Sequence, residues 1–270
     1  MIHLRSVSFR PLAEDDPVSA AFPFSLPVIR SLRELRLETP VTLLVGENGS
    51  GKSTLLEAMA IASRAITAGS AEATEDETLS GVQALAGRLR LGWATRKHRG
   101  FYLRAEDFFG YAKRLATMKA GLEQELADAE IRYAGASDHA RALALLPYRK
   151  ELAALRERYG EGLDTQSHGE SFLRFFGERF VPGGVYFLDE PEAPLSPSRQ
   201  LSFLALVRQL EREAGQFVIA THSPILLSYP GATIWSFDRE PIARVPYEDL
   251  EHVTLTRDFL RDPDAFLRHL

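Results

Sequence analysis

A glycine-rich stretch near the N-terminus has the residue types and spacing of a phosphate-binding loop. Residues 46–53 read Gly-Glu-Asn-Gly-Ser-Gly-Lys-Ser, which is the pattern G-x-x-x-x-G-K-[ST]. Glycines allow the backbone to curl so that successive N–H groups point at an anion. We expect Lys52 to lie between the β- and γ-phosphates of a nucleotide and the Ser53 hydroxyl to bind Mg²⁺. The expected nucleotide-binding residues are Gly46, Glu47, Asn48, Gly49, Ser50, Gly51, Lys52, Ser53 and Thr54.

Two acidic residues and a histidine follow two other apolar runs. Residues 185–188 end in Asp189 and Glu190, and residues 217–220 are followed by a threonine and then His222. Adjacent carboxylates after a buried strand are costly unless cations or water receive them. We therefore expect Asp189 to bind Mg²⁺, Glu190 to orient and deprotonate an attacking water, and His222 to contact the γ-phosphate. The alternative is a solvated strand end.

An α/β fold with a mostly parallel sheet would bring these groups together. The apolar residues 41–45 predict a buried strand, and the apolar periodicity after residue 54 predicts a helix. Ligands of open parallel sheets bind beyond the carboxyl ends of the strands, where the loop, the two acids and the histidine would emerge. Further strands are expected at residues 2–9, 35–37, 88–93 and 101–103, with an edge hairpin at 233–245 and two short helices after it.

Residues 107–159 have helical periodicity, with interruptions at Gly135 and Pro147. We expect two or three helices, which form an insertion over residues 107–165. An arm of roughly 20 residues would reach only about 30 Å, which is too short for a long coiled coil.

Two segments leave a choice between a ligand contact and a structural role. Phe22 or Phe24 could stack on an adenine, but we expect such an aromatic side chain to pack against the core. The basic residues 96–100 could contact a nucleic-acid backbone, but we expect a solvated hairpin tip between strands 88–93 and 101–103.

A polar segment precedes a helix near Glu170. Ser167 and Glu170 have the spacing of a capping box, in which each side chain bonds a backbone N–H at the start of the helix. That structural explanation requires no ligand.

The composition excludes several classes of protein. The 270 residues are 45% hydrophobic, which is sufficient for a core, and none is a cysteine that could form a disulfide or a thiolate metal site. We find neither a secretory signal nor a segment long enough to span a bilayer, and we expect a soluble, cytoplasmic protein without membrane insertion. The net charge of −5 means that any nucleic-acid contact would be local.

The order of these motifs resembles that of the ATP-binding cassette (ABC) ATPases over nearly the whole chain. The segments QSHGESFL, FLDEPEAPLSP, ATHSPILL and LTRDFL are similar to those of stand-alone bacterial ATPases related to repair and SMC chromosome ATPases. The resemblance implies a P-loop NTPase fold with an N-terminal antiparallel β subdomain and a short helical insertion, all within one domain over residues 1–270. It also implies an enzyme that binds ATP and Mg²⁺ and hydrolyses ATP to ADP and phosphate.

The resemblance assigns roles to individual positions. Residues 46–54 match the Walker A loop, residues 186–190 match Walker B, and residues 193–196 match the D-loop. The implied catalytic residues are Lys52, Glu190 and His222.

The resemblance also implies a partner. Ser167, Gly169 and Glu170 match the signature that completes the ATP site of a second subunit, so a homodimer is expected on ATP binding. The Q-loop glutamine of the family has no clear counterpart. Glu106 lies closest, and its carboxylate could meet Mg²⁺ or water.

Three uses of such an ATPase compete. The first is a dimer switch that acts on nucleic acid or a nuclease partner in DNA repair or defence, which the basic turn and the resemblance favour. The second is the nucleotide-binding subunit of an ABC transporter, which the missing glutamine disfavours. The third is a small-molecule kinase, which is disfavoured because the adjacent Asp189 and Glu190 favour water as the acceptor.

Overall fold

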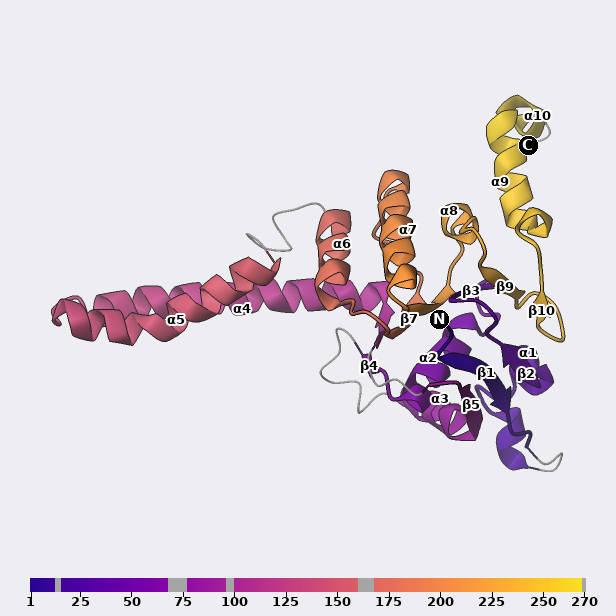
Figure 1. Ribbon diagram of the computed structural model, residues 1–270, viewed down its shortest axis with the longest axis horizontal. Coiled ribbons are helices and arrows are strands. Elements are labelled where there is room, and N and C mark those ends of the chain that lie inside the picture. The colour runs from indigo at the N-terminus through magenta and orange to yellow at the C-terminus, as the bar shows by residue number, and fades with distance from the viewer. Residues whose placement is uncertain (13–15, 68–76, 96–99, 160–167, 269–270) are drawn as a thin grey trace. The chain divides into compact units, whose positions relative to one another are not determined.

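The computed structural model describes residues 1–12, 16–67, 77–95, 100–159 and 168–268 (Figure 1). The chain divides into two compact units. The first comprises Met1–Ala105 and Phe180–Leu270, and the second comprises Glu106–Arg179. Among the described residues, no helix combines the length and the apolar character that crossing a bilayer requires.

A seven-stranded sheet forms the centre of the first unit. Its strand order is β10-β9-β3-β8-β7-β6-β4, and all neighbouring pairs are parallel except β9 with the edge strand β10. The expected α/β class and the C-terminal edge hairpin are therefore confirmed. The strands are β3 (Val41–Val45), β4 (Ile66–Thr67), β6 (Phe101–Arg104), β7 (Val185–Asp189), β8 (Gln216–Ala220), β9 (Thr233–Ser236) and β10 (Ala243–Arg244).

Three adjacent strands of this sheet end at the same edge. Leu44 of β3 pairs with Ala220 of β8, and Ala220 also pairs with Asp189 of β7. Every residue of these three strands is buried, as is typical of parallel strands in the middle of a sheet. The loops that follow β3, β7 and β8 therefore begin side by side, as the sequence predicted.

A separate antiparallel sheet has β1 (Leu4–Phe9) between β2 (Glu34–Arg36) and β5 (Leu89–Trp93). The expected hairpin between residues 88–93 and 101–103 is wrong, because β5 pairs with β1 whereas β6 pairs with β4 and β7. The burial of the two strands explains the difference: β6 is almost fully buried, whereas β5 alternates between covered and exposed positions. Residues 96–99 of the basic turn lie outside the described residues.

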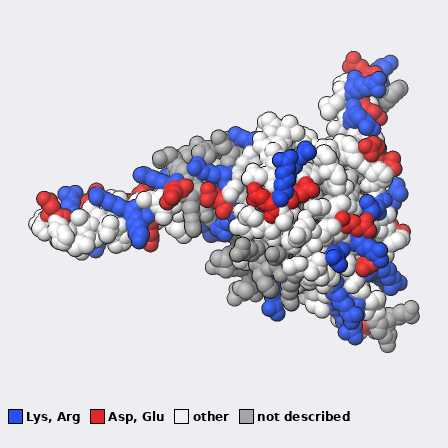
Figure 2. All heavy atoms as spheres, in the orientation of Figure 1, with Lys and Arg blue, Asp and Glu red and all other residues white. Residues whose placement is uncertain are grey.

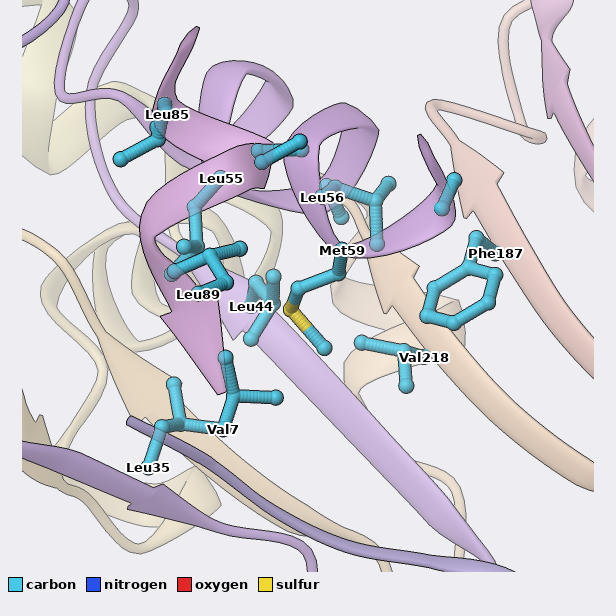
Figure 3. Close-up of a cluster of buried hydrophobic side chains, with 14 of the residues drawn as sticks. Val7, Leu35, Leu44, Leu55, Leu56, Met59, Leu85, Leu89, Phe187 and Val218 are labelled. Carbon is cyan, nitrogen blue, oxygen red and sulfur yellow. The ribbon is translucent and has the colours of Figure 1, made fainter. Parts of the chain in front are cut away.

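Helix α2 (Lys52–Ser63) contributes to the core that joins the two sheets of the first unit. Figure 3 shows its Leu55, Leu56 and Met59 among apolar side chains that come from both sheets. The buried apolar residues of α2 lie on several of its faces, as is typical of a helix that is covered on several sides. This packing fixes Lys52, the first residue of α2, relative to the strands that carry the acids and the histidine.

Helix α3 (Glu77–Arg88) packs on α2 and was not predicted from the sequence. Its buried residues Val82, Leu85 and Ala86 recur at spacings of three and one. Together with Leu89 these residues follow a helical period. The helix was missed because this apolar pattern is short and continues without a break into β5.

A buried glutamine also links the two sheets. Gln216 of β8 is fully buried, and its Oε1 accepts hydrogen bonds from the N–H groups of His3 and Leu4, both at 2.8 Å. Its Nε2 donates to the carbonyl oxygen of Leu4 at 2.7 Å. These bonds satisfy backbone groups that burial would otherwise leave unpaired.

The connection between β1 and β2 differs from the expected loop. It contains a 3-10 turn, η1 (Pro17–Ala20), and leads into helix α1 (Pro27–Ser31). Phe24 is 2% exposed and belongs to the core, so its expected structural role is confirmed. Phe22 is 52% exposed.

The remaining elements of the first unit follow the sheet strands. The predicted helical pieces at the C-terminus are confirmed, and Asp262 caps the second by accepting from the N–H of Ala265 at 3.1 Å. The elements are α7 (Pro197–Arg212), α8 (Pro224–Leu227), η2 (Tyr247–Asp249), α9 (Glu251–Arg261) and α10 (Pro263–Leu267).

The second unit is helical. It contains α4 (Ala105–Arg132), α5 (Asp138–Tyr159) and α6 (His168–Arg179). The first residue of α4, Ala105, is the last residue of the first unit's N-terminal segment. Arg149 of α5 forms a 3.0 Å ion pair with Glu130 of α4, so the two long helices lie side by side (Figure 1).

Two details of this unit differ from expectation. Pro147 does not end a helix but lies inside α5, where Leu145 and Leu152 are buried and hold the helix in place. Helix α4 has 28 residues, so its length is about 42 Å rather than the expected 30 Å.

Candidate functional site

The loop between β3 and α2 has a conformation that only glycine can adopt at two positions. Gly46 has φ of +153°, and a Cβ there would lie 2.9 Å from the Cβ of Phe237. Gly51 has φ of +95°, and a Cβ there would lie 2.9 Å from Cγ1 of the buried Val28. The loop is therefore a backbone cradle with its N–H groups at the start of α2, which is a suitable site for an anion.

Lys52 is buried beneath this cradle. Lys52 is 4% exposed, and its Nζ donates to the carbonyl oxygens of Gly46 at 2.6 Å and Glu47 at 2.8 Å. Burial lowers the pKa of Lys52, while the nearby carboxylates of Glu190, Asp238 and Asp189 oppose that change. The ammonium is thus fixed in the loop by backbone oxygens, and an anion could replace them.

The Ser53 hydroxyl lies against the carboxylate that ends β7. Ser53 Oγ donates to Asp189 Oδ1 at 2.9 Å. Burial raises the pKa of Asp189 to about 6, against the opposing effects of Ser53 and Arg104. A hydroxyl and a carboxylate at this separation are oxygen ligands of the kind that Mg²⁺ prefers.

Arg104 is a site residue that sequence analysis missed. It ends β6 directly opposite Asp189 in the sheet, with its Nε 3.6 Å from Asp189 Oδ2. Its Nη2 atom is 2.7 Å from Glu57 Oε2 on α2. One signal was available in the sequence, a charged residue at the end of an apolar run, but the pairing of β6 with β7 was needed to place it.

Glu190 and His222 form the open side of the site. The Oε1 atom of Glu190 lies 3.7 Å from Nε2 of His222, and the two side chains are 46% and 37% exposed. Glu190 has φ of +49°, a left-handed conformation that is unfavourable for a residue with a side chain and is often found at functional sites. Burial and the charge of Lys52 lower the pKa of His222, and Glu190 opposes them.

Glu192 connects the loop after β7 to the loop after β8, and it was not predicted. Its Oε1 accepts from Thr221 Oγ1 at 2.7 Å, from the N–H of His222 at 2.8 Å and from the N–H of Ser223 at 3.1 Å. Burial raises the pKa of this carboxyl. The sequence offered only an acidic residue two positions after Glu190.

Asp238 supports the opposite side of the phosphate-binding loop. It follows β9, which is parallel to β3 and therefore ends at the same edge of the sheet. Its Oδ1 accepts from the N–H of Glu47 at 2.6 Å. Asp238 was also missed, because its role depends on which strand lies next to β3.

The other predicted site residues lie as follows. Glu47, Asn48 and Gly49 are exposed in the loop, and Ser50 and Thr54 are partly exposed. Glu106 is an exposed residue in the first turn of α4, in the second unit. Gly169 and Glu170 lie in the first turn of α6 in that unit, and Ser167 lies outside the described residues.

Two family models match the chain. The one described as "AAA domain, putative AbiEii toxin, Type IV TA system" matches residues 96–228, and one described as "AAA domain" matches residues 25–75. A search of the curated proteins found no match.

Several solved structures are similar over most of their length. An SMC head domain from Pyrococcus furiosus, with an extended coiled coil and bound to the C-terminal domain of ScpA, has 12% identity, covers 97% of this chain and 100% of that one, and has a TM-score of 0.49. The cassette cbiO1 of Clostridium perfringens, part of an ABC transporter complex, has 15% identity, covers 100% of both chains and has a TM-score of 0.47. A nucleotide-free ATP-binding cassette from an ABC transporter has 18% identity, covers 100% of this chain and 99% of that one, and has a TM-score of 0.45.

Proposed function

We propose that this chain, an ATPase of the AAA and ABC P-loop class, hydrolyses ATP at a site that a second copy of the chain completes. One observation carries the proposal: the glycine cradle, the Ser53–Asp189 pair and the Glu190–His222 pair follow three adjacent parallel strands. The Ser53–Asp189 pair supplies oxygen ligands for a metal ion, and the Glu190–His222 pair supplies a general base and an imidazole. Hydrolysis of a phosphate requires both functions.

The cradle and Lys52 would bind the phosphates of ATP. The fit is supported by Gly46 and Gly51, where a Cβ would collide with Phe237 and Val28 and displace the loop. It is also supported by the Lys52 ammonium, whose hydrogen bonds within the described part of the chain go to backbone oxygens. Ser53 and Asp189 would hold Mg²⁺, which supplies charge neutralisation to the phosphates when it is bound.

Glu190 would act on the attacking water. It would orient the water and accept its proton while the oxygen bonds to the γ-phosphorus and ADP leaves. His222 would donate a hydrogen bond to the γ-phosphate. Both side chains are partly exposed, whereas Nε2 of His222 itself is shielded from solvent and has no hydrogen-bond partner among the described residues.

A second copy would close the site. We propose that Ser167, Gly169 and Glu170 of that copy contact the γ-phosphate, with the N-terminus of α6 adding favourable N–H groups. Two ATP molecules would then hold a head-to-tail dimer together, and hydrolysis would release it.

Glu190→Gln tests the base and the dimer together. The variant should bind ATP, hydrolyse it about 100-fold or more slowly, and accumulate as a dimer, because the general base is removed while the binding groups remain. ATP affinity, phosphate release and molar mass by light scattering measure the three properties. A variant that stays monomeric with saturating Mg-ATP would contradict the dimer.

Ser167→Arg is the matched variant for the second subunit. It should leave ATP binding intact and abolish turnover, because it blocks the contact made across the dimer. Unchanged turnover would favour the simple capping-box role of Ser167, and a wild-type protein without ATPase activity would refute the proposed function itself.

We further propose that the switch acts on nucleic acid. Arg36 and Arg90 lie on the exposed face of the antiparallel sheet, opposite Ser6 and Ser8 in the register. Figure 2 shows Lys and Arg side chains grouped over the part of the first unit where Figure 1 labels β1 and β2, with some acidic side chains among them. Glu34 of β2 forms an ion pair with Arg36 at 2.9 Å. Stimulation of the ATPase by DNA, and its loss in Arg90→Glu, would support this use.

A further inference from the structure

The loop after β7 and the loop after β8 are joined by a closed set of hydrogen bonds. On one side, Glu192 Oε1 accepts from Thr221 Oγ1 and from the N–H groups of His222 and Ser223, at 2.7, 2.8 and 3.1 Å. On the other side, Ser223 Oγ donates to Gln200 Oε1 at 2.5 Å.

The set closes through the backbone of the first loop. Gln200 Nε2 donates to the carbonyl oxygen of Leu195 at 3.2 Å, and the N–H of Leu195 donates to the carbonyl oxygen of Glu192 at 2.8 Å. Gln200 lies on α7, so the helix, residues 192–195 and residues 221–223 are bonded to one another in a ring.

We infer that Glu192 is a positioning residue that makes residues 190–196 and the His222 loop move as one body, so that a partner subunit contacting the first loop sets the position of His222. The inference rests on the proposed function for the role of the partner. Ala193 and Ser196 are exposed in the first loop, so they are available for such a contact, whereas Leu195 is buried and anchors it.

Two further observations support a specific role for the carboxylate. The other oxygen, Glu192 Oε2, is shielded from solvent and accepts no hydrogen bond among the described residues. A carboxyl group is thus buried in order to bind one short segment of backbone next to His222. A small apolar residue would avoid that cost of burial, so the position is better explained by holding the loop than by packing.

Glu192→Ala tests this role, with two readouts. It should lower kcat about 10- to 100-fold, the effect of losing hydrogen bonds to a charged group, while the Kd for ATP stays near the wild-type value. In the nucleotide-free protein, the amide hydrogens of His222 and Ser223 should exchange with solvent faster than in the wild type. Glu192→Gln should restore most of both properties, because its amide oxygen can accept the same three hydrogen bonds.

A second pair of variants keeps the test valid if Glu192→Ala does not fold. Gln200→Ala removes the bonds to Ser223 and Leu195 and should also lower kcat and speed exchange at Ser223. Gln209→Ala is the control on the same helix and should behave as the wild type, because this exposed side chain bonds only Glu213 within the part of the chain that the structure describes.

The outcomes separate the inference from the proposed function. If the wild type hydrolyses ATP and Glu192→Ala has the same kcat, the inference is overturned. If the wild type does not hydrolyse ATP, the proposed function fails, and amide exchange decides about the ring of bonds: unchanged exchange at His222 and Ser223 overturns it, and faster exchange supports it.

Discussion

Gly51→Ala offers a quantitative test of the phosphate cradle. The substitution places a Cβ 2.9 Å from Cγ1 of Val28, at a residue with φ of +95°. A left-handed backbone costs an L-residue roughly 1–2 kcal/mol, and crowding against a well-packed core costs roughly 1–3 kcal/mol. Because Val28 is 3% exposed and cannot move into solvent, both costs apply to the conformation that binds ATP.

The expected result is a loss of ATP affinity. The combined cost of roughly 2–5 kcal/mol corresponds to a Kd at least about 30-fold higher, since 1.4 kcal/mol is a factor of ten. Titration with a fluorescent ATP analogue measures the Kd, and thermal unfolding verifies that the variant is folded.

Two other glycines provide matched controls. Gly49 has φ of +82° but nothing within 4 Å of its Cβ position, so Gly49→Ala carries only the backbone cost, and its Kd should rise about 5- to 30-fold. Gly87 in α3 has no such φ and an open Cβ position, so Gly87→Ala should bind ATP as the wild type does. The reasoning about crowding is refuted if Gly51→Ala binds ATP as tightly as Gly49→Ala.

Two further predictions concern stability. Gln216→Leu should lower the free energy of unfolding by about 3 kcal/mol or more in urea titrations, because it leaves the buried N–H groups of His3 and Leu4 without acceptors; a loss below about 1 kcal/mol would contradict this. Burial lowers the pKa of His252, and the charge of Asp238 opposes that change. The contribution of the neutral His252 to stability is therefore present above the usual pKa of 6.5 and is lost as the pH falls through the lower pKa of the folded state. His252→Gln should therefore lose less stability than the wild type between pH 7.5 and pH 5, and an equal loss in urea titrations at the two pH values would argue against that role.

The local patterns of the sequence were sufficient to predict that the phosphate-binding motif, Asp189 and His222 follow strands that end at one edge of the sheet. The G-x-x-x-x-G-K-[ST] loop, the acids after residues 185–188 and the histidine after residues 217–220 are short-range signals, because in each case the functional residues follow a strand end within a few positions. Their common edge follows from the general geometry of parallel sheets. The two AAA-domain models agree with the resemblance at the level of the P-loop ATPase class.

The tertiary structure decided which residues surround these motifs. The sequence does not reveal that β6 lies beside β7 or that β9 lies beside β3, so it could not place Arg104 against Asp189 or Asp238 against the phosphate-binding loop. The same limitation produced the wrong hairpin between β5 and β6, since short strands have similar local patterns whichever sheet they join.

Glu192 illustrates the physical reason most clearly. Along the chain it is one more acidic residue after Glu190, and nothing in its spacing distinguishes it from a solvated side chain. Only the pairing of β7 with β8 brings its carboxylate to the N–H groups of His222 and Ser223, 30 and 31 residues away. The sequence by itself determined which groups could do chemistry, whereas long-range strand pairing determined which groups hold them in place.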